Sequence, residues 1–195
     1  EAKKYRAELI ERIVENDEAL MNEYLDGKEI PLDVLKKNLR KAVIGNEIFP
    51  VLTGSSLKNK GVILVLDAIR HNHPSPLDKP DTKAMDVKDH SKIILRKADV
   101  KEPMTSLAFK IMSDPFVGRL TFVRVYSGVL RNGSYVVNTN SGKKERIGRL
   151  LQMHANDRLE VTEIPAGNIG AVVGLKDTLT GDTLCDEKYP VMLEQ

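Results

Sequence analysis

The hydrophobic periodicity of this 195-residue chain changes near residue 75, and this change constrains the fold more than any other feature. Before it, apolar residues recur at helical spacing, as in Tyr5, Leu9 and Ile13. After it, apolar and polar residues alternate, as in residues 106–111, which is typical of half-buried strands. Residues 73–81, with three prolines, separate the two patterns and are expected to form a semi-rigid linker. The sequence therefore predicts a helical part followed by a separate β-domain.

The first part of the chain is expected to hold three helices and one short strand. Residues 1–24, and a stretch opened by Pro31 and closed by Gly45, have the pattern of amphipathic helices. Residues 47–53 are interpreted as a short strand that Pro50 marks as an edge. Residues 61–71 are apolar almost all round, as expected of a helix that packs against a sheet.

The second part is expected to form several short antiparallel strands. The polar residues up to about Lys97 are interpreted as a loop. Beyond them, turn sequences at 131–134, 140–142 and 165–167 separate runs rich in β-branched residues, and the Asn-Gly pair in the first is a strong hairpin signal. Because no helical pattern lies between these runs, they predict a small antiparallel barrel or sandwich.

Composition restricts the class of protein but does not identify a function. Apolar residues make up 41% and charged residues 30% of the chain, which is ordinary for a soluble globular protein. No apolar run is long enough to span a bilayer and the charged start is unlike a secretory signal, so we expect no membrane partner. The single cysteine, Cys185, fits a reducing compartment, and no basic neighbour activates it as a nucleophile. The net charge of +2 does not by itself indicate nucleic acid.

The histidines and most carboxylates do not form a metal-binding or catalytic pattern. His71 and His73 lack the paired spacing of zinc ligands, so surface or helix-end histidines are favoured and no metal is expected. The carboxylates between residues 8 and 17 are interpreted as a solvated helix face, with a docking face for a partner protein as the alternative.

The chain lacks the motifs that hold the phosphates of a nucleotide. A phosphate-binding loop needs a glycine five residues before Gly-Lys, and neither Gly27-Lys28 nor Gly142-Lys143 has one. Asn59-Lys60 is similar to a guanine-specificity motif, but Val62 stands where that motif has a carboxylate. No Asp-x-x-Gly is present, so the magnesium and γ-phosphate switch is missing. We therefore expect no catalytic residue, no cofactor and no GTP hydrolysis in this chain alone.

A basic run follows the predicted turn at 140–142 and is a candidate RNA-binding site. Its cations are Lys143, Lys144, Arg146 and Arg149. Four cations within seven residues could contact phosphates, and the scarcity of aromatic neighbours favours the backbone of folded RNA over stacked single strands. The alternative is that lysines on an edge strand prevent aggregation. Because alternation fails at Leu150-Leu151, the sequence does not decide which side chains face outward.

Several segments give the chain a resemblance to elongation factor G, the ribosomal translocase. The longest is residues 50–62, which resembles the last guanine-recognition motif of that family and the helix start after it. The other similar segments are residues 24–27, 66–69, 74–78, 108–111, 114–120, 124–128, 152–156 and 180–184. Together these segments extend over nearly the whole chain.

The resemblance implies a multi-domain mixed α and β fold and its boundaries. Residues 1–46 would be the helical end of a subdomain inserted in a P-loop-type α/β GTPase domain, and residues 47–73 the last strand and helix of that domain. A linker at 74–97 would lead to an antiparallel translation-factor β-barrel at 98–190. Residues 191–195 would begin the connection to a third domain, so the chain would be an internal segment of its parent.

The resemblance also implies a remnant of the guanine-base site, at Gly54, Ser55, Ser56 and Leu57. Serine stands at position 56 where the family usually has alanine. In the family a backbone amide at that position recognises the guanine carbonyl, and serine keeps this amide. GTP or GDP with magnesium would be the cofactors of the full-length parent, whereas this fragment is expected to bind none.

The function implied for the parent is ribosome-dependent GTP hydrolysis that drives translocation of tRNA and mRNA. The partners would be small-subunit ribosomal RNA for the barrel and a ribosomal stalk protein for the helical subdomain, and the protein would be a monomer in the cytoplasm or an organelle matrix. Within the same class, a ribosomal-protection tetracycline-resistance protein and a class-3 release factor are alternatives. From another class, the alternative is a stand-alone RNA-binding barrel with a helical arm and no nucleotide.

Overall fold

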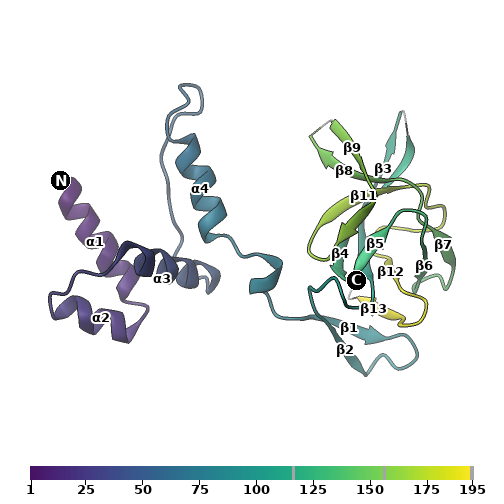
Figure 1. Cartoon of the computed structure of the whole chain (residues 1–195), viewed down its shortest axis with the longest axis horizontal. Helices are drawn as coiled ribbons and strands as arrows, with labels where there is room; N and C mark the ends of the chain where they lie inside the picture. Colours follow the sequence, from purple (N-terminus) through teal and green to yellow (C-terminus); the bar gives the residue numbers. More distant parts are fainter. Residues whose placement is uncertain (116, 156, 194–195) are drawn as a thin grey trace. The chain divides into compact units, whose positions relative to one another are not determined.

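The computed structural model describes residues 1–115, 117–155 and 157–193, and it divides into two compact units (Figure 1). The first unit is Glu1–Pro74 and the second is Ser75–Gln195. The boundary falls inside the proline-containing stretch 73–81, as the change of hydrophobic period predicts. Each unit is described by itself below.

The first unit is built from four helices. They are α1 (Ala2–Val14), α2 (Glu18–Leu25), α3 (Leu32–Ile44) and α4 (Val62–Asn72). Ile13 and Val14 at the end of α1 are buried against Ile30 and Leu35, which forms a small core. Asn38 donates a hydrogen bond of 2.6 Å from Nδ2 to the carbonyl oxygen of Ile13, so the buried end of α1 is held by α3.

Helix α4 contacts the rest of the first unit but buries no residue. The guanidinium of Arg40 on α3 donates hydrogen bonds to the carbonyl oxygens of His71 at 2.6 Å and His73 at 2.9 Å, which anchors the carboxyl end of α4. Large apolar side chains of α4 remain exposed, namely those of Ile63, Leu64, Val65, Leu66 and Ile69. The prediction of a strand at 47–53 is wrong, because every one of these residues is described and none lies in a strand. A strand needs a neighbour to pair with, and among the described residues of this unit the only bridge is Ser55 to Lys60.

The second unit contains one large antiparallel sheet and two small ones (Figure 1). In spatial order the large sheet consists of β7 (Lys144–Arg146), β6 (Tyr135–Asn138), β12 (Thr183–Cys185), β3 (Thr105–Asp114), β4 (Gly118–Ser127), β11 (Ile169–Val173), β8 (Leu150–His154) and β9 (Asp157–Val161). A second sheet pairs β5 (Val129–Arg131) with β10 (Glu163–Pro165), and a third has the order β13 (Val191–Leu193), β1 (Thr82–Asp86) and β2 (Ile93–Arg96). A short 3-10 helix, η1 (Pro76–Asp78), precedes them.

One hydrophobic core joins the large sheet to the β5–β10 pair. Val123 and Val125 of β4 are fully buried in it, together with residues from β3, β5, β6, β8, β10, β11 and β12. Because most strands of the large sheet and both strands of the β5–β10 pair contribute to this core, the sheet curls around it, which is the barrel-like arrangement that the alternation predicts. Pairing is antiparallel throughout the described strands.

The stretch between residues 82 and 97 differs from the predicted loop. It forms the hairpin β1–β2, and β1 also pairs with β13, which places Ala84 opposite Leu193. Strands this short give little alternation, and β1 also depends on β13, more than a hundred residues along the chain, for its second partner. Residues 191–193, expected to begin a connection to another domain, therefore lie in a sheet of the second unit, while residues 194–195 lie outside the described residues.

The three predicted turns form, but the first does not make a hairpin. At Asn132-Gly133 the chain turns with a φ of 75° at the glycine, yet β5 pairs with β10 whereas β6 pairs with β7 and β12. This turn is therefore a corner between two sheets. The turn at 140–142 does join a hairpin, β6–β7, and the turn at 165–167 leads from β10 to β11.

Candidate nucleic-acid interface

The β6–β7 hairpin presents its charged side chains in alternation. Tyr135 pairs with Arg146 and Val137 with Lys144, so that Lys144 and Arg146 are exposed while Glu145 and Ile147 are buried. This settles the orientation that the sequence left open. Arg149, beyond the strand, is also exposed.

The two lysines of the hairpin are paired with carboxylates. Lys143 Nζ lies 2.7 Å from Asp177 Oδ1, and this hydrogen bond and the charge of Asp177 raise the pKa of the Lys143 ammonium group. Lys144 Nζ lies 2.5 Å from Glu187 Oε2 and 5.4 Å from the centre of the Tyr135 ring. Both ion pairs are largely exposed, so they weaken but do not remove the positive field of the lysines.

The two arginines of the basic run differ from the lysines in their partners. Within residues 1–115, 117–155 and 157–193, no ion pair or side-chain hydrogen bond joins Arg146 or Arg149 to another residue. A guanidinium offers five N–H donors in a planar fork that fits phosphate oxygens. Arg146 and Arg149 are therefore better placed than the lysines to contact an anionic partner.

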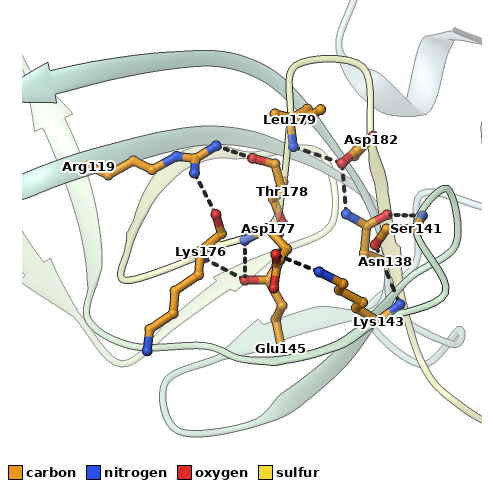
Figure 2. Close-up of polar contacts among 10 residues, drawn as sticks. All are labelled: Arg119, Asn138, Ser141, Lys143, Glu145, Lys176, Asp177, Thr178, Leu179 and Asp182. Atoms are coloured by element: carbon orange, nitrogen blue, oxygen red, sulfur yellow. Dashed lines mark hydrogen bonds and ion pairs between the residues drawn. The ribbon is translucent and has the colours of Figure 1, made fainter.

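Beneath the hairpin, the buried Glu145 holds the loop that leads from β11 to β12 (Figure 2). One carboxylate oxygen, Oε2, accepts hydrogen bonds from the backbone amides of Lys176 at 2.6 Å and Asp177 at 3.2 Å. The other, Oε1, accepts from the Thr178 hydroxyl at 2.5 Å. From β4, Arg119 donates to the carbonyl oxygens of Lys176 at 2.6 Å and of Thr178. Glu145 thus binds the hydrogen-bond donors of residues 176–178, and Arg119 binds two carbonyl oxygens of the same segment.

A second group of contacts ties the tip of the hairpin to the end of the same loop (Figure 2). Asn138 donates from Nδ2 to Asp182 Oδ2 at 2.7 Å, and that oxygen also accepts from the Leu179 amide at 2.7 Å. The other side of the Asn138 amide, Oδ1, accepts from the backbone of Asn140 and Ser141. The hairpin that carries the basic run is therefore held to the loop between β11 and β12 by both groups of hydrogen bonds.

The basic run was identified from sequence, but the residues that position it were not. Glu145, Arg119, Thr178 and Asp182 attract no notice singly. One sequence feature could have indicated Glu145, namely the alternation of side chains along a strand. A strand that exposes Lys144 and Arg146 must turn Glu145 inward. A buried carboxylate then needs donors, which only the folded chain identifies.

The predicted guanine-site remnant lies in the first unit and forms a tight turn. Ser55 and Lys60 exchange two backbone hydrogen bonds of 2.9 Å, and an added Cβ at Gly54 would lie 2.7 Å from the Lys60 carbonyl oxygen. The amides of Ser56 and Leu57 donate to no residue that the structure describes, and both residues are exposed. The turn thus presents free backbone donors, while the basic run belongs to the other unit.

Two negative findings concern metals and membranes. Among the described residues, no group of three or more His, Cys, Asp or Glu side chains is placed to hold a metal ion. Nor does any described helix have the length and apolar character needed to cross a bilayer.

Comparison with known proteins identifies the class of the barrel. Residues 118–185 match the family described as elongation factor Tu domain 2. The structure is also similar to a crystal structure of a protein from Thermus thermophilus, with a TM-score of 0.70 and 28% sequence identity over 96% of this chain. The match covers 25% of that protein, so this chain spans about a quarter of its length. These findings support the translational GTPase class and no particular member of it.

Proposed function

We propose that this chain is a segment of an elongation factor G-type GTPase that promotes GTP-dependent movement of tRNA and mRNA through the ribosome. The observation that carries the translational part of the proposal is the match of residues 118–185 to elongation factor Tu domain 2, and the structural likeness over 96% of the chain extends to the helical unit as well. The sequences of segments 114–120 and 152–156 favour a translocase over a tetracycline-protection protein or a class-3 release factor. Phe116 and Asn156 in these segments lie outside the described residues.

The exposed apolar side chains of α4 support the assignment of residues 47–73 to the end of a GTPase domain. Ile63 is 73%, Leu64 66% and Leu66 59% exposed. A contiguous apolar surface of this kind marks a place where other structure docks. The sheet of an α/β GTPase domain, supplied by other parts of the parent, would cover it. Residues 1–46 would then be the helical subdomain inserted in that domain.

In the proposed parent the turn at 54–57 receives the guanine base. The free amides of Ser56 and Leu57 can donate to a carbonyl oxygen, and the backbone bridge between Ser55 and Lys60 holds the turn in shape. Phosphates and magnesium would be held by parts of the parent outside this chain. GTP or GDP with magnesium is thus a cofactor of the parent, and the chain alone supplies one contact region.

The two units would meet different ribosomal partners. On the second unit, Arg146 and Arg149 would contact small-subunit ribosomal RNA, with Lys143 and Lys144 contributing a weakened field. On α1, Tyr5 and Leu9 are one helical turn apart and are 66% and 52% exposed, so they offer an apolar contact for a stalk protein. A protein with these partners acts in the cytoplasm or an organelle matrix.

The proposal is tested on the full-length protein that contains this chain. We expect GTP hydrolysis to be stimulated by ribosomes, and a toeprinting assay to show that the mRNA advances by one codon. Relief of tetracycline inhibition without codon movement would favour the tetracycline-resistance protein. Stimulation of peptide release without codon movement would favour the release factor. GTP hydrolysis that ribosomes do not change would overturn the translational assignment.

The RNA contact is tested on the 195-residue chain with fragments of small-subunit ribosomal RNA. Arg146→Ala combined with Arg149→Ala is expected to weaken binding and to reduce the slope of log affinity against log salt by about 1 for each lost phosphate contact. The matched control, Lys143→Ala with Lys144→Ala, removes the same number of cations but ones that already have carboxylate partners, so its effect should be smaller. If replacing all four leaves the affinity unchanged, the basic run serves solubility instead.

A further inference from the structure

A half-open cavity of about 680 Å³ lies in the second unit, away from the basic run. It is bordered by Arg96 at the end of β2 and by Arg124 and Tyr126 of β4. Arg96 thus comes from the three-stranded sheet and Arg124 from the large sheet, so the cavity is formed where two sheets meet. Its size is within the range of small-molecule sites in proteins.

Both arginines keep donors that the protein does not use. Arg96 is only 7% exposed, and its guanidinium donates one hydrogen bond of 3.0 Å from Nη2 to the carbonyl oxygen of Tyr189. The Nε atoms of Arg96 and Arg124 are buried and have no hydrogen-bond partner among the described residues. A buried charged donor without an acceptor is costly, so the two guanidinium groups beside this cavity would gain from an acceptor that they could reach.

The charge around the cavity identifies the kind of acceptor. Two further cations, Lys79 and Lys97, line it, against two carboxylates, Asp81 and Asp99. Asp99 already accepts a hydrogen bond of 2.9 Å from the Lys101 amide, which occupies one of its oxygens. Four cationic side chains against two acidic ones leave a net charge of +2, which matches a dianion rather than a neutral ligand.

We propose that this cavity binds the phosphate group of a small phosphate monoester. Guanidinium groups bind phosphate with paired N–H donors, and a monoester near neutral pH supplies about two negative charges. Leu77, Val100 and the Tyr126 ring give the cavity apolar walls that can contact the organic part of such a ligand. Because protein atoms cover both Nε positions, phosphate binding through these atoms would require both guanidinium groups to turn toward the cavity.

The inference is independent of the translational role, and it is tested by titrating the 195-residue chain while the Nε–Hε resonances of its arginines are followed by NMR. Arg96→Lys and Arg124→Lys assign the two signals. Inorganic phosphate, at ionic strength held constant with sodium chloride, is expected to shift both signals to saturation. The exposed Arg131, paired with Glu163 at 3.2 Å, should not respond. Shifts that do not saturate, or that chloride reproduces, would mean that water satisfies these donors and would overturn the proposal.

The chemical class of the ligand is tested with three nucleoside derivatives. Adenosine monophosphate should saturate the signals at a lower concentration than inorganic phosphate, and adenosine should leave them unchanged. Equal binding of adenosine would refute recognition of phosphate. Tighter binding of a dinucleotide that carries only a diester phosphate would point to RNA, and would overturn the assignment of a small monoester.

Side-chain variants test the same cavity without relying on one spectrum. Arg124→Met keeps much of the aliphatic stem and should weaken phosphate binding about tenfold, whereas Arg131→Met should not. If the spectrum of Arg124→Met shows a disrupted barrel, Lys97→Met on the exposed rim replaces it, with a smaller loss expected. Unchanged affinity in a folded Arg124→Met or Lys97→Met variant contradicts the proposal.

Discussion

Glu145 illustrates how one inward-facing residue changes what a basic run can do. It lies between two exposed cations, but its carboxylate faces the opposite side of the strand and accepts three hydrogen bonds from the loop at 176–178. The loop in turn carries Asp177, which pairs with Lys143 and weakens its positive field. The buried acid therefore helps to position the carboxylate that pairs with Lys143.

Replacing Glu145 with alanine is expected to destabilise the second unit by about 2 to 3 kcal/mol, because two part-buried amides and a buried hydroxyl lose a charged acceptor. Urea unfolding followed by circular dichroism measures the loss. Glu160→Ala, an exposed glutamate on β9, is the matched control and should change stability by less than about 0.5 kcal/mol. Equal effects of the two substitutions would mean that the Glu145 contacts add nothing to stability.

The thiol of Cys185 is expected to resist modification in the folded protein. It is fully buried in β12, and burial raises its pKa, so little of the reactive thiolate is present at neutral pH. Ellman's reagent should therefore label the folded chain far more slowly than the urea-unfolded chain. Rapid labelling without denaturant would show that β12 opens readily or that the thiol is accessible.

At the scale of elements, tight backbone junctions fix how one strand leads into the next. Gly128 lies between β4 and β5 with a φ of 69°, and an added Cβ would lie 2.6 Å from backbone atoms of Glu102 and Met104. Gly133 has nearly the same backbone angle, a φ of 75°, but an added Cβ there would meet no atom within 4 Å. Substitutions at the two glycines therefore distinguish the cost of a positive φ from the cost of a steric clash.

Gly133→Ala is expected to cost about 1 to 2 kcal/mol of unfolding free energy, which is the cost of the left-handed angle alone. Gly128→Ala adds a clash with backbone that cannot move without shifting β3 and should cost about 3 to 5 kcal/mol. Chemical denaturation of the two variants provides the comparison. Similar losses for both would indicate that the chain relaxes around residue 128.

At the scale of the whole molecule, the two units differ in how much they bury. The second unit has a core with residues from most of its strands, whereas α4 in the first has no buried residue. Backbone amides of α4 are therefore expected to exchange with deuterium at least about a hundredfold faster than those of β4 and β11. Mass spectrometry of peptides from the intact chain measures both. Slow exchange in α4 would show that another surface, such as a second copy of the chain, covers it.

The chain alone is expected to show no detectable binding of GTP or GDP. The turn at 54–57 offers backbone donors for a base, but the sequence contains no phosphate-binding loop and no magnesium switch. Isothermal titration calorimetry with each nucleotide, with the full-length parent as the positive control, tests this expectation. Micromolar binding by the 195-residue chain would contradict it.

The sequence by itself determined the features that depend on local pattern. The change of period near residue 75, the helical stripes and the turn glycines follow from side-chain spacing and backbone angles, whereas the inward position of Glu145 came from the structure. The position of the basic run could also be read from the sequence, because formal charge depends on residue type and not on the fold. Local patterns fail where the partner is remote, as at 47–53, where the expected strand has no neighbour.

Only the tertiary structure decided which strands pair and which charged side chains form ion pairs. The Asn132-Gly133 turn is a corner because β5 pairs with β10 whereas β6 pairs with β12. The hairpin of β1 and β2 forms part of a sheet because β13 pairs with β1. Lys143 forms an ion pair with Asp177, and Arg96 and Arg124, from two different sheets, line one cavity. The physical reason is that hydrogen-bond partners and opposite charges act over a few ångströms in space, whatever their separation along the chain.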